Sequence, residues 1–411
     1  MTQLRERANG VLIIVENLPV PLDRRVWQEA TALARAGYPV SVICPKAPGY
    51  EAAYEEREGV RIYRHALPFE ARGALGFVLE YGWALAWEFR LAWRVWREHR
   101  FAVIQACNPP DDIVAIGVLF RALFGTRFVF DHHDAFADLF ALKFPRLRAV
   151  NWLPRLAERL SLRCADHVVT TSDGLRRLAE ERHGVPAERV SIVRSGLDLK
   201  RLPDGIAPDP ALKRGRRFLA LYIGIMGKQD GLDLLLQAAA HMVHDLGRND
   251  ISFVLAGGGP EMPVLQELCH ELGLQDHVEF TGYLTGAAFY RLLASADIGL
   301  CPDPKNAFND KLSMNKVLEY MAFSLPIVQF DLIEGRLLAA EASVYATDND
   351  PRQFGDLTVE LLDDPERCAT MGRFGRARLI EHFAWDRQER IYLNVYRDLI
   401  GAPERVAAEV V

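Results

Sequence analysis

Two histidines and two carboxylates follow a short apolar run in the segment Phe130-Asp-His-His-Asp134. Imidazole and carboxylate groups at the end of a strand can bind a metal or take part in catalysis. Adjacent residues of an extended strand point to opposite sides, so His132 and His133 suit a shared metal poorly unless the chain turns there. We therefore expect one histidine to face a cleft, with a neighbouring carboxylate orienting it.

A lysine and a glutamate lie one helical turn apart in the segment Ser313-Met-Asn-Lys-Val-Leu-Glu-Tyr-Met-Ala322. Ser313 suits a helix N-cap, and the apolar residues behind it follow helical spacing, so Lys316 is expected in the first turn. A cation there opposes the helix dipole unless an anion such as diphosphate binds; the alternative is a solvated lysine. Glu319 either accepts hydrogen bonds from a ribose diol or forms half of a buried ion pair.

Glycine-rich turns directly follow two predicted strands, in Tyr222-Ile-Gly-Ile-Met-Gly-Lys228 and Leu255-Ala-Gly-Gly-Gly-Pro260. Such glycines let phosphate groups approach backbone N–H groups, or serve only as tight strand-to-helix turns. The first predicted strand is followed instead by Glu16–Arg25, which contains no Gly-x-Gly-x-x-Gly. This absence argues against a dinucleotide-binding dehydrogenase.

Parallel sheets must position these segments, because short β-branched runs alternate with helical patterns along the chain. The alternation starts at Val11–Val15 and begins again at Leu219–Ile223, after a Pro- and Gly-rich linker over residues 196–217. For 411 residues, it predicts an α/β protein with two doubly wound domains. The predicted parts are residues 1–200, residues 201–385 and a final helical segment over residues 386–411.

Composition limits the classes of function. The chain has 49 Lys and Arg against 55 Asp and Glu, and residues 1–200 hold 28 of the basic and 24 of the acidic side chains. A nucleic-acid binder would show a stronger basic footprint, although the basic first half suits anionic lipid. The six cysteines are scattered and lack the spacing of a zinc site. The sequence also has no signal h-region and no apolar run of ~18 residues. Together these features predict a cytoplasmic protein.

The helical stretch Glu80–Glu98 presents two different faces at 100° per residue. The face expected in the core consists of Leu85, Phe89, Trp93 and Trp96. The other face consists of Trp83, Trp87, Arg90 and Arg94, and a second basic stripe follows at Arg155, Arg159 and Arg163. Tryptophan with arginine on a polar face is typical of helices that lie at lipid headgroups; the alternative is a solvated face with Trp–Arg stacking.

Six segments occur in one order along the chain. They are Asn17-Leu-Pro-Val-Pro-Leu-Asp-Arg-Arg-Val-Trp-Gln-Glu-Ala30, Asp131-His-His-Asp134, Gly224-Ile-Met-Gly-Lys-Gln-Asp-Gly231, Ala256-Gly-Gly-Gly-Pro260, Phe280-Thr-Gly-Tyr283 and Met314-Asn-Lys-Val-Leu-Glu-Tyr-Met-Ala322. As a set they resemble the retaining glycosyltransferases of family 4. The resemblance implies the GT-B architecture: two Rossmann-like domains face a central cleft, the nucleotide-sugar binds the C-terminal domain, the acceptor binds the N-terminal domain, and the last helix crosses back to the first domain.

The resemblance also implies roles for single residues. His133 resembles the histidine that contacts the transferred sugar, and Glu319 resembles the second glutamate of the family's E-x7-E motif, which holds the ribose. The place of the first glutamate is taken by Lys311, with Asp310 beside it, so these two are candidate sugar contacts.

The family's Gly-Arg…Lys-Gly phosphate pair reads Gly224-Ile225…Asp230-Gly231 in this chain, so we assign the phosphate to Lys228, the nearby cation. The donor-binding residues expected on this basis are Gly224, Gly227, Lys228, Gly258, Tyr283, Leu284, Ser313, Met314, Asn315 and Lys316. The residues expected on an acceptor-binding or membrane-facing surface are Asn17, Trp83, Trp87, Arg90 and Arg94.

The resemblance therefore implies a retaining glycosyltransferase that moves a sugar from a nucleotide diphosphate donor to a glycan or lipid-linked acceptor in bacterial polysaccharide or glycoconjugate synthesis. No Asp-x-Asp motif occurs where diphosphate would bind, so we expect no metal and no other cofactor. The helix dipole, backbone N–H groups, Lys228 and Lys316 would compensate the negative charge of the diphosphate. We expect peripheral attachment to the inner face of the cell membrane. Two alternatives remain, a GT-B sugar-nucleotide epimerase, which needs no acceptor, and a catalytically silent GT-B scaffold protein.

Overall fold

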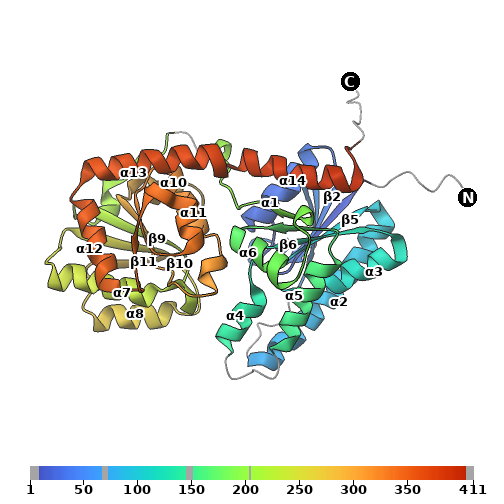
Figure 1. The fold of residues 1–411 in the computed structure, drawn as a ribbon, viewed down its shortest axis with the longest axis horizontal. Coiled ribbons are helices and arrows are strands. Elements are labelled where there is room, and N and C mark those ends of the chain that lie inside the picture. The colour runs from blue at the N-terminus through green and yellow to red at the C-terminus, as the bar shows by residue number, and fades with distance from the viewer. Residues whose placement is uncertain (1–8, 67–72, 145–150, 203–204, 404–411) are drawn as a thin grey trace, which may run out of the picture. The chain divides into compact units, whose positions relative to one another are not determined.

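The structure, a computed structural model, describes residues 9–66, 73–144, 151–202 and 205–403. The chain forms two compact units, each built around a sheet of mostly parallel strands (Figure 1). Unit 1 comprises Met1–Arg194 and Gln388–Val411, and unit 2 comprises Ser195–Arg387. Among the described residues, no helix combines the length and apolar character needed to cross a membrane.

Unit 1 contains an eight-stranded sheet in the order β3-β4-β2-β1-β5-β6-β7-β8, in which only β3 runs antiparallel to its neighbour. Its strands are β1 (Val11–Val15), β2 (Val40–Pro45), β3 (Tyr54–Arg57), β4 (Val60–His65), β5 (Val103–Cys107), β6 (Arg127–His132), β7 (His167–Thr170) and β8 (Val190–Ile192). The central strands β1, β2 and β5 are buried along their whole length, because helices cover both faces of a parallel sheet.

The helices of unit 1 lie on opposite faces of this sheet (Figure 1). One face carries α1 (Arg24–Arg35) and the later part of α14 (Trp385–Ile400), which are joined by an ion pair between Arg35 and Glu389 at 3.0 Å. The other face carries α2 (Gly73–His99), α3 (Val114–Phe124) and α5 (Trp152–Cys164). Two shorter helices, α4 (Phe136–Lys143) and α6 (Asp173–Arg177), follow β6 and β7.

The buried face of α2 differs from the face expected from the sequence. Phe89 and Trp93, expected in the core, remain 37% and 39% exposed; both rings contact Phe120 of the neighbouring helix α3, and Trp93 also contacts Phe124. Leu85 and Trp96 are half-buried. The buried stripe of α2 consists instead of Ala84, Glu88, Leu91, Ala92 and Val95. Its two alanines allow the helix to approach the sheet closely, which a stripe of large rings would prevent.

Unit 2 contains a six-stranded, fully parallel sheet in the order β11-β10-β9-β12-β13-β14. Its strands are β9 (Phe218–Ile225), β10 (Ile251–Gly258), β11 (Val278–Gly282), β12 (Ile298–Cys301), β13 (Ile327–Phe330) and β14 (Ser343–Ala346). Together with the sheet of unit 1, this arrangement confirms the predicted fold class of two doubly wound α/β domains.

Two apolar clusters cover the two faces of the unit 2 sheet. One involves α7 (Leu232–Ala240), α8 (Met262–Glu271) and α12 (Pro351–Leu362), and the other involves α9 (Gly286–Ser295), α10 (Asn315–Ala322) and α11 (Ile333–Ala339). Helix α13 (Pro365–Arg378) contacts both α10 and α12. The strands therefore end between two helical layers, where the glycine-rich turns and the start of α10 lie.

Candidate functional site

His133 follows the C-terminal end of β6 in unit 1, two residues after Asp131. Its Nε2 atom lies 2.6 Å from Oδ2 of Asp131, and its side chain is 17% exposed. His132 is fully buried, and neither of its ring nitrogens has a hydrogen-bond partner among the described residues. The two histidines therefore have different environments, as expected for adjacent residues of an extended strand, and His133 is the one that reaches solvent.

The carboxylate that holds His133 belongs to a buried ion-pair network. Arg25 of α1 donates from Nη2 to Oδ1 of Asp131 at 2.7 Å and pairs with Oε1 of Glu29 at 3.0 Å. Burial opposes ionisation of Asp131, yet the charges of Arg25 and His133 outweigh it and lower its pKa. Because the ionised carboxylate can only accept, Nε2 of His133 carries the proton of this hydrogen bond, and Nδ1 is the other ring nitrogen available for a ligand.

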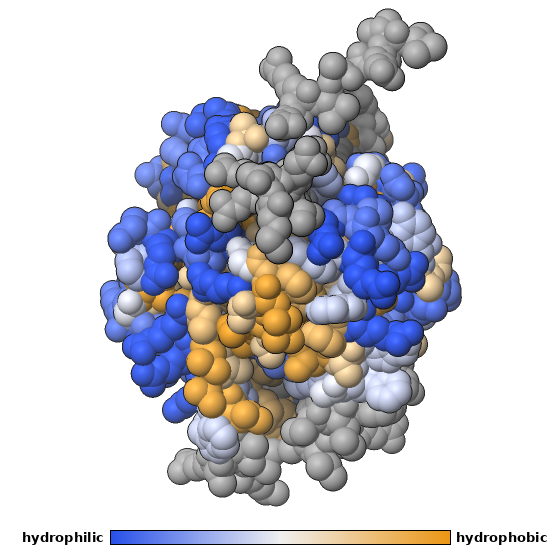
Figure 2. All heavy atoms as spheres, turned by 90° about the vertical axis from the view of Figure 1, so that its right-hand side faces the viewer, coloured by the Kyte–Doolittle hydropathy of each residue, from blue (hydrophilic) through white to orange (hydrophobic). Residues whose placement is uncertain are grey.

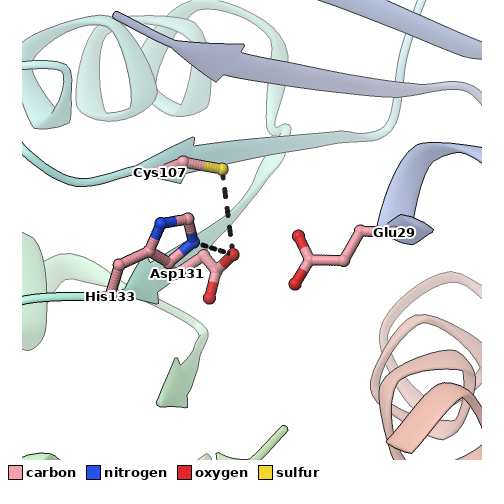
Figure 3. Close-up of side chains that lie close together, drawn as sticks. All are labelled: Glu29, Cys107, Asp131 and His133. Carbon is pink, nitrogen blue, oxygen red and sulfur yellow. Dashed lines mark hydrogen bonds and ion pairs between the residues drawn. The ribbon is translucent and has the colours of Figure 1, made fainter. Parts of the chain in front are cut away.

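Glu29, Cys107, Asp131 and His133 lie close enough together to form a candidate metal site (Figure 3), with one ligand atom of each within 4.8 Å of the others. Burial, followed by the charges of Asp131 and Glu29, raises the pKa of the Cys107 thiol well above its usual range. The guanidinium of Arg25 already bonds both carboxylates. A divalent cation would have to displace this guanidinium and deprotonate the thiol, so we interpret the cluster as a charge-balanced network that orients His133.

In unit 2, the glycine-rich turns after β9 and β10 bring two backbone segments together. Gly257 has a φ of 146°, and a Cβ atom at this position would lie 1.8 Å from the carbonyl oxygen of Gly224, so only glycine fits there. A Cβ atom at Gly258 would lie 2.8 Å from the ring of Tyr283. The Tyr283 hydroxyl donates to the carbonyl oxygen of Gly258 at 3.0 Å, although the side chain is 71% exposed. An exposed aromatic ring thus stands beside the buried glycine backbone at the end of β10.

Other expected donor-binding residues lie around these turns. Gly227 is buried, and its N–H group donates to Oδ2 of Asp230 at 2.9 Å. Leu284 is half-buried beside Tyr283. Lys228 is exposed, and among the described residues it has no ion-pair partner. Its ammonium group is therefore available to a bound anion.

Lys316 is buried, and the alternative of a solvated lysine is wrong. Its Nζ atom lies 2.7 and 3.0 Å from the two carboxylate oxygens of Asp303 and 4.8 Å from the centre of the Tyr222 ring. Burial opposes ionisation of Lys316, but the charge of Asp303 and the Tyr222 side chain outweigh it and raise its pKa well above the usual range. Its charge is thus compensated before any anion binds, which leaves Lys228 as the better candidate for a diphosphate.

The start of α10 lies one residue later than expected. The N-cap is Met314, whose backbone is extended and whose side chain makes no capping bond, so the prediction that Ser313 caps the helix is wrong. Asn315 is exposed, and Glu319 is 7% exposed within the helix. Of the two candidate sugar contacts, Asp310 pairs with Lys305 at 3.2 Å and accepts from a backbone N–H group, and Lys311 is half-buried.

The residues expected on the acceptor or membrane face are largely exposed. Asn17 follows β1 and is exposed, and Trp83 is 47% exposed. The Arg90 guanidinium lies 5.7 Å from the centre of the half-buried Trp87 ring. Arg94 pairs with Glu98 at 2.8 Å. Trp87 and Arg90 therefore stack on this face, and Glu98 compensates part of the positive charge of Arg94.

Three residues that position these sites were not singled out from the sequence: Arg25, Gln105 and Asp303. The spacing of Arg25 and Glu29 by four residues on a predicted helix is a recognisable signal for an ion pair. Gln105 and Asp303 carry no such local signal. Gln105 is a polar residue within an apolar strand, and Asp303 follows a strand end thirteen residues before its partner Lys316.

The fold of the two units is that of GT-B glycosyltransferases. Sucrose-phosphate synthase from Thermosynechococcus elongatus superposes with a TM-score of 0.77 at 18% identity, covering 96% of this chain and 100% of that chain. WaaG, a glycosyltransferase of lipopolysaccharide biosynthesis, gives a TM-score of 0.69 at 15% identity, covering 95% of this chain and 100% of that one. These similarities establish the fold alone.

Residues 22–196 match the family model of the glycosyl transferase 4-like domain, and residues 217–364 match that of glycosyl transferases group 1. The chain belongs to the group 1 glycosyltransferases. It is 26% identical to alpha-D-kanosaminyltransferase of Streptomyces kanamyceticus over 81% of this chain and 88% of that protein. It is 23% identical to a D-inositol 3-phosphate glycosyltransferase of Corynebacterium urealyticum, where the match spans only 62% of each chain.

The Lys316–Asp303 pair generates a stability prediction. We expect Asp303→Asn to lower the free energy of unfolding by about 3–5 kcal/mol, because it leaves a buried ammonium without its counter-ion. Chemical denaturation followed by circular dichroism measures this change. Lys228→Met is the matched control, since the exposed Lys228 pairs with none of the residues that the structure describes. An equal loss in both variants would contradict the assignment of the two lysines.

Proposed function

We propose that the protein transfers a sugar from a nucleoside diphosphate sugar to a hydroxyl group of a glycan or lipid-linked acceptor, with retention of configuration at the anomeric carbon. The observation that carries the proposal is His133, a partly exposed imidazole at a strand end whose Nε2 is bound by an ionised, buried carboxylate. Relatives named as kanosaminyl and inositol phosphate glycosyltransferases support transfer of a sugar. HepE from Anabaena, solved with UDP and glucose, has the same fold at a TM-score of 0.72 and 16% identity, over 95% of this chain and all of that one.

Unit 2 provides the groups that a nucleotide sugar requires. Glu319, inside the first turns of α10, would accept hydrogen bonds from the ribose hydroxyls. Lys228 and the backbone N–H groups of the two glycine-rich turns would bind the diphosphate. Tyr283 and Leu284 would lie beside the nucleobase, where the exposed ring of Tyr283 offers a stacking surface.

The proposed transfer needs no protein nucleophile. The bond between the anomeric carbon and the phosphate oxygen breaks, and its electron pair leaves with the diphosphate. The acceptor hydroxyl oxygen bonds to the anomeric carbon on the same face and gives its proton to the departing phosphate oxygen. His133 would contact a sugar hydroxyl through Nδ1 and stabilise the positive charge that develops on the sugar, while Lys228 would stabilise the leaving group.

We propose that this reaction needs no metal ion. The charge on the leaving diphosphate would be met by Lys228, by backbone N–H groups and by the N-terminal end of α10. The buried Asp303, which could otherwise serve as a metal ligand, already pairs with Lys316 at 2.7 Å.

We further propose that unit 1 binds an anionic membrane surface, and that the binding area extends beyond Trp83 and Trp87. Hydrophobic side chains gather over the side of unit 1 that carries α3 (Figure 2). The exposed apolar residues of α3 and the adjacent α5 are Val118, Leu119, Leu123, Phe124, Trp152, Leu153, Leu156 and Leu160. Arg155 and Arg159 are exposed on the same helix α5. Apolar side chains interleaved with arginines fit lipid headgroups above an acyl core.

The nucleotide site is tested by binding. A thermal-shift screen against nucleotide sugars identifies the donor, since a ligand at 100 times its dissociation constant stabilises a protein by about 2.7 kcal/mol. We expect Glu319→Gln to weaken binding of the matching nucleoside diphosphate, measured by calorimetry, by tenfold or more, because a hydrogen bond to a charged group contributes about 1.5–3 kcal/mol.

Glu271→Gln, on the exposed side of α8, is the control for this substitution. Full affinity in Glu319→Gln would remove Glu319 from the site. Formation of an isomeric nucleotide sugar without acceptor would identify an epimerase instead. A protein that binds no nucleotide sugar and hydrolyses none above background would be a silent scaffold.

Metal independence is tested with the same donor. Turnover should persist in excess EDTA, because the positive charge at the leaving group comes from the protein. Complete loss of turnover, restored by Mg²⁺ or Mn²⁺, would show that the charge assignment is wrong.

Membrane binding is tested by sedimentation with vesicles. We expect the protein to sediment with phosphatidylglycerol vesicles at low salt and to be released at high salt, because each basic residue near an anionic surface contributes about 1 kcal/mol and salt screens it. Replacing Leu119, Leu123, Leu156 and Leu160 by glutamine should abolish binding, and replacing Trp83, Trp87, Arg90 and Arg94 together should weaken it.

Val264→Gln, at a residue that is 58% exposed on α8 of unit 2, serves as the control for removing exposed apolar area. Equal sedimentation with neutral and anionic vesicles, or none with either, would contradict the proposal. Loss of a protein dimer in the leucine variant without any vesicle binding would assign the patch to a second copy of the chain.

A further inference from the structure

Gln105 is a fully buried glutamine in the middle of β5, between β1 and β6. All of its side-chain hydrogen-bonding groups face polar partners. Its Nε2 atom donates to Oε2 of Glu29 at 2.7 Å and to Oδ2 of Asp131 at 3.2 Å. Its Oε1 atom accepts from the hydroxyl groups of Tyr392, at 2.6 Å, and of Tyr396. The orientation of the amide is therefore fixed, because reversing it would place its oxygen against two carboxylates.

The amide of Gln105 bridges two buried carboxyl groups, those of Glu29 and Asp131. Oδ2 of Asp131 is also the acceptor for Nε2 of His133, at 2.6 Å. Burial raises the pKa of Glu29 well above its usual range, although Arg25 partly opposes this shift. Without the N–H groups of Gln105, Oε2 of Glu29 and Oδ2 of Asp131 would lose the donor that they share, and the Asp131 carboxylate would be less firmly held beside His133.

The two tyrosines come from the segment that joins the units. Helix α14 begins with Trp385–Arg387 in unit 2 and continues in unit 1 from Gln388. Tyr392 and Tyr396 are one turn apart, so both hydroxyl groups reach the same face of the sheet. Both side chains are completely buried, and their hydroxyl groups lie 3.2 Å apart. In Figure 3 the pale red helix next to Glu29 is α14.

We propose that Gln105, held by Tyr392 and Tyr396, is a positioning residue that fixes the orientation of the Asp131 carboxylate, whose Oδ2 binds Nε2 of His133. Gln105 and the tyrosines touch no reacting atom; they act through Asp131. The order of contacts is Tyr392 and Tyr396 to Gln105, Gln105 to Asp131, and Asp131 to His133. The inference rests on the proposed function only for the claim that His133 contacts the sugar. The tautomer of His133 does not depend on that claim.

Attachment of α14 to unit 1 does not by itself require this network. The Tyr38 hydroxyl donates to the carbonyl oxygen of Gly401 at 2.8 Å, just beyond the C-terminal end of α14. Arg35 pairs with Glu389 near its start, at 3.0 Å. These contacts tether the same helix without touching Gln105. Tyr38→Phe is therefore a matched control, because it removes one tyrosine hydroxyl that tethers this end of the chain and leaves the network intact.

The tautomer of His133 is the direct readout. The full chain is labelled with ¹⁵N at histidine, and His133→Asn identifies the His133 signals. Well above the usual pKa range of histidine, the ¹⁵N shifts should show the Nε2–H tautomer in the unaltered protein and in Tyr38→Phe. In Gln105→Met, which removes both N–H donors at similar length, and in the double variant Tyr392→Phe with Tyr396→Phe, the imidazole should divide between both tautomers.

Turnover gives a second readout with the donor found by the thermal-shift screen. We expect kcat to fall about tenfold or more in the double tyrosine variant, with KM for the donor within about twofold, because the histidine acts mainly in the transition state. The kcat of Tyr392→Phe alone should be close to that of the unaltered protein, since Tyr396 still donates to Gln105. Tyr38→Phe should change neither constant.

Three results would overturn the proposal. One is an unchanged His133 tautomer in both network variants, and another is an equal fall of kcat in Tyr38→Phe, which would assign the tyrosines to tethering alone. The third is a fall in the melting temperature that accounts for the whole loss of turnover. If Gln105→Met does not fold, the double tyrosine variant still decides. Full turnover in His133→Ala with the expected tautomer shift in the network variants would contradict the proposed function and leave the positioning network in place.

Discussion

The buried guanidinium of Arg25 determines what the C-terminal edge of the unit 1 sheet can do. It pairs with Asp131 and Glu29 and donates to the carbonyl oxygen of Val193 at 2.7 Å, so it connects α1, β6 and the segment after β8. Removal of one partner from such a buried pair costs about 3–5 kcal/mol, because the remaining charge has no compensation. The same cation keeps Asp131 ionised, and the ionised carboxylate fixes the imidazole of His133. The orientation of His133 is therefore a consequence of how α1 docks on the sheet.

Unit 2 uses an equivalent arrangement at its own strand ends. Lys316 reaches from the first turn of α10 to Asp303 after β12, and the pair is buried against the Tyr222 ring. In both units a buried cation binds a strand-end carboxylate, and a second polar group is left partly or fully exposed: His133 in unit 1 and Lys228 in unit 2. Buried pairs hold their geometry, while exposed groups stay available to a ligand. This division explains why Lys316, the lysine of the α10 segment, stabilises the structure and is not the group left available to a ligand.

Local patterns predicted most of the fold, because strand runs, helical spacing and glycine turns depend on neighbouring residues. The alternation rule also placed His132 and His133 in different environments. The failures have long-range causes. The buried face of α2 depends on how α3 covers Phe89 and Trp93, and the state of Lys316 depends on Asp303. Gln105 contacts tyrosines that lie 287 and 291 residues away, a separation at which a single sequence carries no pairing signal.

The opposite face of unit 1 shows what a strand-end carboxyl group becomes without a cation. Glu16 follows β1, and both it and Glu88 of α2 are buried; among the described residues neither has an ion-pair partner. Burial, followed by the charges of Glu88 and Asp112, raises the pKa of Glu16 to about 10, so at neutral pH this group is a carboxylic acid. Asp131, two strands away, is a carboxylate that accepts. Burial thus keeps a carboxyl group protonated where no cation lies beside it, whereas the charge of a neighbouring guanidinium keeps a buried carboxyl group ionised.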